Sequence, residues 1–451
     1  MTAVLPTRPA VCAPALPRVV GADLQVPLVT GERVRYANLD LAASAPALEA
    51  VAEHVTALLP YYASVHRGAG YASQVSTTVL ERARETVGRF VGAREDDVVV
   101  FTRNTTDALN LLAGCVPGPV LRLDVEHHAN LLAWGPGRVL RAAGTVERTL
   151  ADLRRALAAD RPALLAVTGA SNVTGEVLPL AEITALAHAA GARVVVDGAQ
   201  LAPHRRIDIA AAGVDYLALS GHKLYAPYGA GALVGRRDWL DVAAPHLAGG
   251  GAVRAVAAPD AGGATEVTWA PAPHRHEAGT PNVLGAAALA EACRHLADGL
   301  DVTHEAALLD RLETRLAAVP GVRTLRIWPD STDRVAVSTF VVDGRPAGLV
   351  AAYLSAEHGI GVRDGKFCAH PLLQRLAGTD DGCAVRASLG VGTTADDVDR
   401  LVDAVEWLVT DGPRWDYAVV DGRWSPVPDP RDLDPLGLGP ATAAPLPACG
   451  H

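Results

Sequence analysis

Lysine is almost missing from this chain of 451 residues, which holds two lysines, Lys223 and Lys366, against thirty-eight arginines. A sequence that favours arginine this strongly is expected to keep lysine where a guanidinium group cannot replace an amine. The main role of that kind is an amine that loses its proton and forms a Schiff base, because arginine stays protonated in proteins. The scarcity of lysine therefore makes the two that remain candidates for chemistry.

Other scarcities exclude whole classes of protein. Aromatic residues make up 4% of the chain, so its hydrophobic share of 49% comes mainly from Ala, Val and Leu. No run of about 18 apolar residues occurs, so we expect no membrane span, and residues 1–20 lack the apolar stretch of a signal peptide. Six cysteines without close pairing predict neither a disulfide framework nor a metal site. Such cysteine usage fits a reduced cytoplasm best. A net charge of −10 argues against a nucleic-acid or anionic-membrane surface.

Short apolar runs alternate with helical patterns over much of the chain. The expected strands lie at 98–102, 120–123, 163–167, 193–197, 216–219 and 231–234, and helical patterns at 105–113, 148–158 and 180–190 lie between some of them. Apolar strands that alternate with helices predict an α/β fold, in which a mainly parallel sheet is covered on both faces.

Changes in this rhythm divide the chain into four parts. Residues 1–30 are rich in proline and are predicted to be a loose arm, and residues 31–283 form the large domain around the sheet. Residues 284–410 contain a helix-rich stretch and then mixed strands and helices, which predicts a smaller α+β domain. Proline and glycine dominate residues 411–451, which we expect to be a disordered tail.

Two expected strands end in residues that suit one cofactor. Asp197 closes one strand, and Lys223 follows the next strand after Ser220 and His222. In open parallel sheets, ligands bind beyond the carboxyl ends of the strands. An amine for the aldehyde and a carboxylate for the pyridine nitrogen are what pyridoxal phosphate requires. The competing interpretation of Asp197 as a helix cap is disfavoured by Lys223.

Polar residues at three other strand ends leave their roles open. Asn104, Thr105 and Thr106 begin an expected helix, where backbone N–H groups and hydroxyls would hold a phosphate, unless Asn104 simply caps the helix. His127 would stack on a planar cofactor or be an exposed loop histidine. Asn172 would donate an amide hydrogen bond.

Nine motifs along residues 36–410 resemble one family in their type and order. They are Leu39-Asp-Leu-Ala-Ala-Ser44, Val65-His-Arg-Gly68, Asn104-Thr-Thr-Asp107, Glu126-His-His-Ala-Asn130, Ser171-Asn172, Asp197-Gly-Ala-Gln200, Ser220-Gly-His-Lys223, Glu277-Ala-Gly-Thr-Pro-Asn282 and Arg386-Ala-Ser388. The chain thus resembles the class V aminotransferase-like group of fold-type I pyridoxal phosphate enzymes, and within it the cysteine desulfurases of the SufS/Csd type. This resemblance implies a large domain with a mainly parallel seven-stranded sheet and a smaller α+β C-terminal domain.

The resemblance also implies roles around the cofactor ring. Lys223 would hold pyridoxal 5'-phosphate as a Schiff base and move the proton of the substrate Cα. Asp197 would pair with the ring nitrogen, Gln200 would bind the ring hydroxyl, and His127 would stack on the ring face.

Further residues would hold the phosphate and the substrate. The resemblance assigns the phosphate to Thr105, Thr106, Ser220 and His222, with Thr280 from a partner subunit. It assigns the α-carboxylate of an amino-acid substrate to Asn172 and Arg386, which suits the bidentate fork of arginine. A site shared in this way implies a homodimer.

A loop cysteine distinguishes the expected reactions. Cys368 fits the family pattern Arg-x-Gly-x-x-Cys, although this chain has Lys366-Phe367 where the family commonly has two histidines. Its thiolate would take the sulfur of L-cysteine as a persulfide, release L-alanine and pass the sulfur to an acceptor protein. Lys366 and His370 would lower the thiol pKa.

Several alternatives to this reaction remain. The same scaffold serves C–S lyases, epimerases and aminotransferases, for which Cys368 would be a small loop residue without chemistry. A regulator that kept only the fold is disfavoured, because a scaffold needs neither Lys223, Asp197 nor Arg386.

Overall fold

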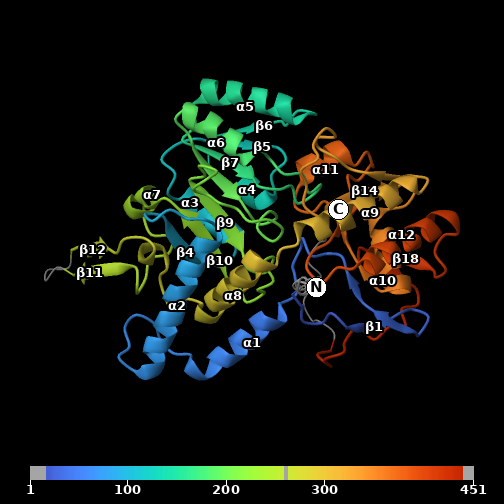
Figure 1. Ribbon diagram of the computed structural model, residues 1–451, viewed down its shortest axis with the longest axis horizontal. Helices are drawn as coiled ribbons and strands as arrows, with labels where there is room; N and C mark the ends of the chain where they lie inside the picture. Colours follow the sequence, from blue (N-terminus) through green and yellow to red (C-terminus); the bar gives the residue numbers. More distant parts are fainter. Residues whose placement is uncertain (1–16, 136, 259–262, 440–451) are drawn as a thin grey trace, which may run out of the picture.

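The computed structural model describes residues 17–135, 137–258 and 263–439, so part of the predicted arm (1–16) and the end of the predicted tail (440–451) lie outside the described residues. Figure 1 shows a large domain around a central sheet, with a smaller domain beside it.

A seven-stranded sheet forms the centre of the large domain and confirms the predicted α/β fold. Its order is β4-β10-β9-β8-β7-β5-β6, and β10 runs antiparallel to both of its neighbours while the remaining pairs are parallel. The strands are β4 (Val98–Thr102), β5 (Val120–Leu123), β6 (Gly137–Leu140), β7 (Leu164–Thr168), β8 (Arg193–Asp197), β9 (Tyr216–Ser220) and β10 (Gly231–Gly235). The sequence does not predict the edge strand β6, because its four residues include a glycine and an arginine.

Alternate side chains of the strands enter separate cores on the two faces of the sheet. In β8, Val194 and Val196 pack in one core and Val195 packs in the other, as the two-residue period of a strand requires. Buried residues of α2 (Tyr71–Phe90), α5 (Val146–Asp160), α6 (Leu180–Ala189) and α8 (Val283–Gly299) complete the first core, and those of α3 (Thr105–Ala113) and α7 (Arg237–Val242) complete the second. With both faces covered, ligands have access at the ends of the strands.

The small domain is built on four antiparallel strands in the order β13-β14-β17-β16. They are β13 (Val322–Thr324), β14 (Val337–Val342), β16 (Arg363–Gly365) and β17 (Ala384–Ser388). Helices α9 (Val302–Ala318), α10 (Ala347–His358) and α12 (Ala395–Thr410) share its core. β16 leads directly into the loop of Cys368, so this domain brings the thiol to the edge of the large one.

The described part of the N-terminal segment is packed, which differs from the predicted loose arm. β1 (Gln25–Pro27) pairs with β2 (Arg33–Arg35), and β3 (Ala37–Asn38) pairs with β15 (Ile360–Gly361) of the small domain. Leu28 and Val29 are buried. The proline content of the segment conceals this apolar run, which supplies the contacts that hold the segment in place.

The predicted boundary after residue 283 precedes a helix that belongs with the large domain. Helix α8 packs along α2 and α1 (Glu49–Leu58), both of which lie before that boundary. The apolar face of α8 therefore completes the large-domain core, and the small-domain elements begin after it.

A hairpin corrects the predicted disordered tail. β18 (Tyr417–Val420) pairs with β19 (Arg423–Pro426) and the hairpin lies against α10. Trp424 covers Gly348 so closely that a Cβ at that glycine would lie 2.9 Å from the indole ring. Glu357 of α10 accepts hydrogen bonds from the Trp415 backbone at 3.2 Å and the Tyr417 hydroxyl at 3.1 Å. These aromatic anchors outweigh the Pro- and Gly-rich composition on which the prediction rested.

Candidate active site

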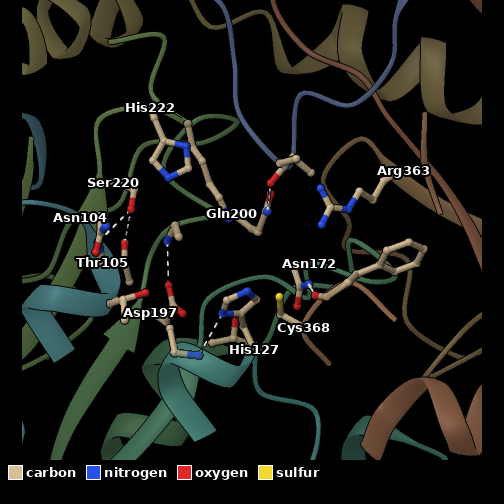
Figure 2. Close-up of a pocket in the computed structure, with 18 of the residues that line it drawn as sticks. Asn104, Thr105, His127, Asn172, Asp197, Gln200, Ser220, His222, Arg363 and Cys368 are labelled. Carbon is tan, nitrogen blue, oxygen red and sulfur yellow. Dashed lines mark hydrogen bonds between the residues drawn. The ribbon is translucent and has the colours of Figure 1, made fainter. Parts of the chain in front are cut away.

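The carboxyl ends of β8 and β9 open into a cavity of about 220 Å³ that residues of both domains line (Figure 2). The structure brings together here all predicted site residues except Thr280: Thr105, Thr106, His127, Asn172, Asp197, Gln200, Ser220, His222, Lys223, Cys368 and Arg386. The cavity lies where ligands bind in open parallel sheets, which makes it the candidate active site.

A carboxylate and an amine of this cavity have shifted pKa values. Asp197 is 4% exposed, and its Oδ1 accepts a hydrogen bond from the Ala199 N–H at 3.0 Å. Burial raises the pKa of Asp197, against the opposing effects of that hydrogen bond and of Lys223. Desolvation lowers the pKa of Lys223 to about 8, because the charged amine is disfavoured away from water. Shifts of this kind in a shared cavity are typical of functional sites.

His127 and Gln200 present defined polar atoms beside this pair. His127 is the N-cap of α4 (His128–Leu132), and its Nδ1 accepts a hydrogen bond from the Ala129 N–H at 3.0 Å. Burial lowers the pKa of His127 to about 3, so its ring is neutral at pH 7 and carries its proton on Nε2. Gln200 donates Nε2–H to the Ala42 carbonyl at 2.7 Å, which orients its amide.

Hydroxyl groups and the N-terminus of α3 form another part of the wall. Asn104 caps α3 by accepting a hydrogen bond from the Asp107 N–H at 3.0 Å, so the capping role is filled. The Thr105 N–H donates to Ser220 Oγ at 2.8 Å, and Ser220 Oγ donates to Thr105 Oγ1 at 2.9 Å. Thr106 lines the same wall. A helix N-terminus with adjacent hydroxyls suits an anion such as phosphate.

Arg386 on β17 is held in place with one N–H group unsatisfied. Its Nη1 donates to the Asn172 carbonyl at 2.9 Å and its Nη2 donates to Asp40 Oδ1 at 3.1 Å. Its buried Nε has no hydrogen-bond partner among the described residues. An unpaired buried donor costs free energy that an incoming acceptor restores, so Arg386 is suited to bind a carboxylate.

The Cys368 loop is anchored on the large domain. Phe367 and Cys368 both have left-handed backbone angles, with φ of +47° and +54°. Asn172 Nδ2 donates to the Phe367 carbonyl at 2.8 Å, and the His128 N–H donates to the Cys368 carbonyl at 2.7 Å. These bonds stabilise a backbone conformation that is otherwise unfavourable for residues with a side chain, and they fix the thiol at the cavity wall.

Lys366 and His370 do not line the cavity, and their predicted effect on the thiol stays a prediction. Lys366 lies beside Gly382, and His370 packs edge-on against His128 with ring centroids 4.5 Å apart. Lys223 and Arg386 both interact electrostatically with Cys368.

Comparison with known proteins identifies the family. A model of the aminotransferase class-V family matches residues 37–401. The chain belongs to this family. A cysteine desulfurase of Dickeya dadantii is 38% identical over 392 residues, which is 83% of this chain and 92% of that protein. A probable cysteine desulfurase of Pseudomonas aeruginosa is 39% identical over 388 residues, which is 82% of this chain and 92% of that protein.

Solved structures of cysteine desulfurases share the fold. An apo structure of the enzyme from Thermococcus onnurineus superimposes with a TM-score of 0.74 at 31% identity and covers 83% of this chain and 94% of that one. The Escherichia coli cysteine desulfurase CsdA, solved as an S-sulfonic acid, gives a TM-score of 0.71 at 34% identity and covers 82% of this chain and 94% of that one. Within the class-V aminotransferase family, the chain is therefore a cysteine desulfurase-like protein.

Thr280 does not line the candidate active site of its own chain. It lines a second cavity, of about 650 Å³, together with His66, Arg67 and Arg254. The expectation for Thr280 involved a partner subunit, so its place outside the first cavity does not conflict with it.

Two residues that the sequence analysis left without a role belong to the site. Arg363 of β16 lines the cavity, and Figure 2 shows its guanidinium directed toward the centre of the group. Asp40 supports Arg386 through the 3.1 Å contact. Asp40 lies in the first of the nine motifs and Arg363 in the Arg-x-Gly-x-x-Cys pattern, so both are marked in the sequence. Their places at the site follow only from the pairing of segments that are distant in sequence.

In the described parts of the chain, no helix is long and apolar enough to cross a membrane. The same residues include no group of three or more His, Cys, Asp or Glu side chains arranged to hold a metal ion.

Proposed function

We propose that the chain is a pyridoxal phosphate enzyme that removes sulfur from L-cysteine and leaves L-alanine and a persulfide on Cys368. The observation that carries this proposal is the shared cavity of Lys223 and Cys368. An amine that can hold the cofactor and a thiol that can accept sulfur line one cavity. A lyase, epimerase or aminotransferase would need the amine but not the thiol.

The donor set of the cavity fits pyridoxal phosphate. Lys223 would hold the aldehyde carbon, and Asp197 would face the ring nitrogen, whose proton would offset the burial of that carboxylate. His127 would cover the ring face, and Gln200 Oε1 would accept a hydrogen bond from the ring hydroxyl. The phosphate would bind the hydroxyl groups at the start of α3, with Ser220 and His222. The bound cofactor supplies an electron sink for negative charge at the substrate Cα.

Lys223 is suited to move the proton of the substrate Cα. A general acid or base works best when its pKa lies near the working pH. Desolvation brings the pKa of Lys223 to about 8, so its neutral and charged forms are both accessible near neutral pH. The Asp197 carboxylate stabilises the charged amine and offsets part of the desolvation that lowers this pKa.

Cys368 would act as the sulfur acceptor. A bond forms between its Sγ and the substrate sulfur while the carbon–sulfur bond of the substrate breaks. The electron pair of that bond stays on carbon, and a proton then completes alanine. The positive charges of Lys223 and Arg386 favour the thiolate that this attack requires. We place the reaction in the reduced cytoplasm and expect the sulfur to pass to an acceptor thiol or an acceptor protein.

Arg386 and Asn172 would hold the α-carboxylate of the substrate. Arg386 has its Nε available, and Asn172 now gives its amide hydrogen to the Phe367 carbonyl. A carboxylate that binds Asn172 would compete with that carbonyl, so binding of the substrate would be felt at the neighbouring Cys368.

We also propose a homodimer in which Thr280 completes the site of the partner subunit. The second cavity gathers Thr280 with the basic side chains Arg67 and Arg254, which suits contact with an anionic ligand. The β11 (Val253–Ala257) and β12 (Glu266–Trp269) hairpin beside it projects from the large domain, as Figure 1 shows, and would reach a neighbouring subunit.

Alanine formation from L-cysteine tests the proposed reaction. The cofactor-loaded protein is compared with Cys368→Ala, and with Cys383→Ala as a matched control because Cys383 lies in a different depression of the surface. We expect alanine from the wild type and from Cys383→Ala, and a loss of at least about a hundredfold in Cys368→Ala. No alanine from a wild type that holds the cofactor would contradict the proposal and direct attention to a lyase or an epimerase.

A further inference from the structure

The guanidinium group of Arg386 lies over the aromatic ring of Phe367. The distance from Cζ to the ring centroid is 5.1 Å. Arg386 is 3% exposed and Phe367 is 4% exposed, so little water reaches either group. A cation over an aromatic face is attracted by the negative charge of the ring face, and the attraction is stronger where water is excluded.

The same phenylalanine belongs to the loop that presents the thiol. Asn172 contacts both partners of the stack, because its carbonyl accepts a hydrogen bond from Arg386 and its side-chain amide donates one to the Phe367 carbonyl. Arg386, Asn172 and Phe367 therefore form a closed set of contacts. The hydrogen bond to the Phe367 carbonyl and the left-handed backbone of the loop hold the ring in place. The ring then limits how far the guanidinium can tilt.

The two hydrogen bonds of Arg386 do not by themselves fix the tilt of its guanidinium group. It contacts Arg386 through Nη2, and the Asn172 carbonyl is a neutral acceptor at Nη1. These two bonds lie in the guanidinium plane, whereas the ring of Phe367 acts on its face. A leucine would fill part of the same volume but has no negative face to attract the cation.

We propose that Phe367 is a positioning residue for substrate recognition, whose ring holds the Arg386 guanidinium in the orientation that leaves Nε for the substrate carboxylate. The inference rests on the proposed function, because it takes Arg386 as the carboxylate-binding group. It adds that the loop of Cys368 contributes to carboxylate affinity as well as carrying the thiol, so the two tasks share one structural unit.

Binding of L-alanine measures this effect without sulfur transfer, because alanine has the α-carboxylate of cysteine and no thiol. The titration uses the cofactor-loaded protein and follows the visible absorption of pyridoxal phosphate. We expect Phe367→Leu to weaken the binding of L-alanine about tenfold, which corresponds to ~1.4 kcal/mol. A trifluorophenylalanine in place of Phe367 keeps the shape but weakens the negative ring face, and we expect an intermediate loss.

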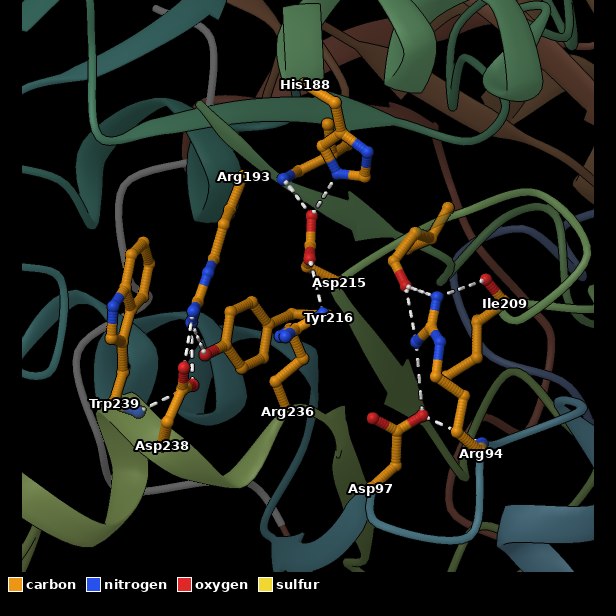
Figure 3. Close-up of polar contacts among 12 residues, drawn as sticks. Arg94, Asp97, His188, Arg193, Ile209, Asp215, Tyr216, Arg236, Asp238 and Trp239 are labelled. Carbon is orange, nitrogen blue, oxygen red and sulfur yellow. Dashed lines mark hydrogen bonds and ion pairs between the residues drawn. The ribbon is translucent and has the colours of Figure 1, made fainter. Parts of the chain in front are cut away.

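Steady-state kinetics with L-cysteine separate positioning from a general structural defect. Loss of orientation at Arg386 should raise KM by a similar factor and change kcat less. The control is Trp239→Leu, at the other end of the sheet. Arg193 lies over the Trp239 ring, with 4.2 Å from Cζ to the ring centroid, so this variant also removes a cation from an aromatic face (Figure 3). This variant should bind L-alanine like the wild type.

The outcomes for this inference and for the proposed reaction differ. Weaker alanine binding in both Phe367 variants supports the inference even if no cysteine is consumed. Unchanged affinity in the fluorinated protein, or equal weakening in Trp239→Leu, would overturn it. A wild type that converts cysteine but binds alanine equally well with leucine at this position would retain the reaction and lose the inference.

Discussion

Charged residues lie at both ends of the large-domain sheet, but the two groups differ in how well partners within the chain balance them. At the amino ends of the strands, Arg193 donates to Asp238 at 2.7 Å and lies over the ring of Trp239 (Figure 3). Next to this pair, Asp215 accepts hydrogen bonds from the Val194 N–H at 2.9 Å and from His188 at 2.8 Å. The charges at this end are matched by partners within the chain.

At the carboxyl ends, the buried charges are less well matched. Burial raises the pKa of Asp197 and lowers that of Lys223, and Arg386 keeps an unpaired Nε within the described structure. Buried polar groups are normally satisfied, so unsatisfied ones need an explanation. The comparison indicates that charges at the amino ends stabilise the fold, while those at the carboxyl ends await a ligand.

The largest expected effect is at Lys223. Replacing it by alanine should prevent stable attachment of pyridoxal phosphate and abolish alanine formation, because no other amine lines the cavity among the described residues. Borohydride reduction and mass spectrometry of the peptides detect the attachment. Lys366→Ala is the matched control, since it removes the remaining lysine of the chain, and should keep both properties. Attachment that moves to Lys366 would contradict the assignment.

Two buried aspartates test the comparison directly. Asp215→Ala leaves the Val194 N–H unpaired, and should lower the free energy of unfolding by about 2 kcal/mol while activity changes little. Asp197→Ala removes a carboxylate whose burial is unfavourable, so we expect a smaller loss of stability and at least about a hundredfold loss of activity. Chemical denaturation and alanine formation are measured on both. The reverse pattern would refute the division between the two ends.

A pH series sharpens the comparison further. The neutral amine of Lys223 is the form that attacks an aldehyde, and its lowered pKa of about 8 means that this form dominates above pH 8 in the apoprotein. The rate of cofactor attachment should rise about tenfold per pH unit below that value and level off above it. A rate that still rises steeply up to pH ~10, where an ordinary lysine titrates, would show that the amine is not desolvated.

The smallest expected effect concerns the C-terminal hairpin. Removal of residues 413–451 exposes the α10 surface that Trp424 covers, and should lower the free energy of unfolding by about 1–3 kcal/mol. The cavity lies elsewhere, so cofactor attachment should be retained. Thermal unfolding with and without the segment measures the first effect, and loss of cofactor binding would show that the hairpin also supports the site.

Much of the fold follows from sequence periodicity. Six strands of the large sheet lie within one residue of their predicted bounds, because they are apolar runs that end in polar residues. Composition gave the wrong prediction for the two terminal segments, where a few apolar side chains determine the structure. Leu28 and Val29 hold the N-terminal segment, and Trp424 holds the C-terminal hairpin, although the proline and glycine around them predicted loose chain.

The sequence was enough to predict which residues line the site, but not which side chains contact one another there. Motifs identified the residues that line the cavity, whereas the support of Arg386 by Asp40 depends on side chains 346 residues apart. The path of the Cys368 loop includes a left-handed backbone conformation at Phe367, which favours glycine and is not expected at a phenylalanine. Periodicity carries no information of that kind.

The position of the transferred sulfur tests the central claim most directly. The cofactor-loaded protein is given one equivalent of L-cysteine that carries a heavy sulfur isotope, and its peptides are then weighed before and after thiol reduction. We predict one labelled sulfur on the peptide of Cys368, lost on reduction, with an equal amount of alanine. Alanine without label on Cys368, or label on the peptide of Cys383 instead, would contradict the role assigned to this thiol.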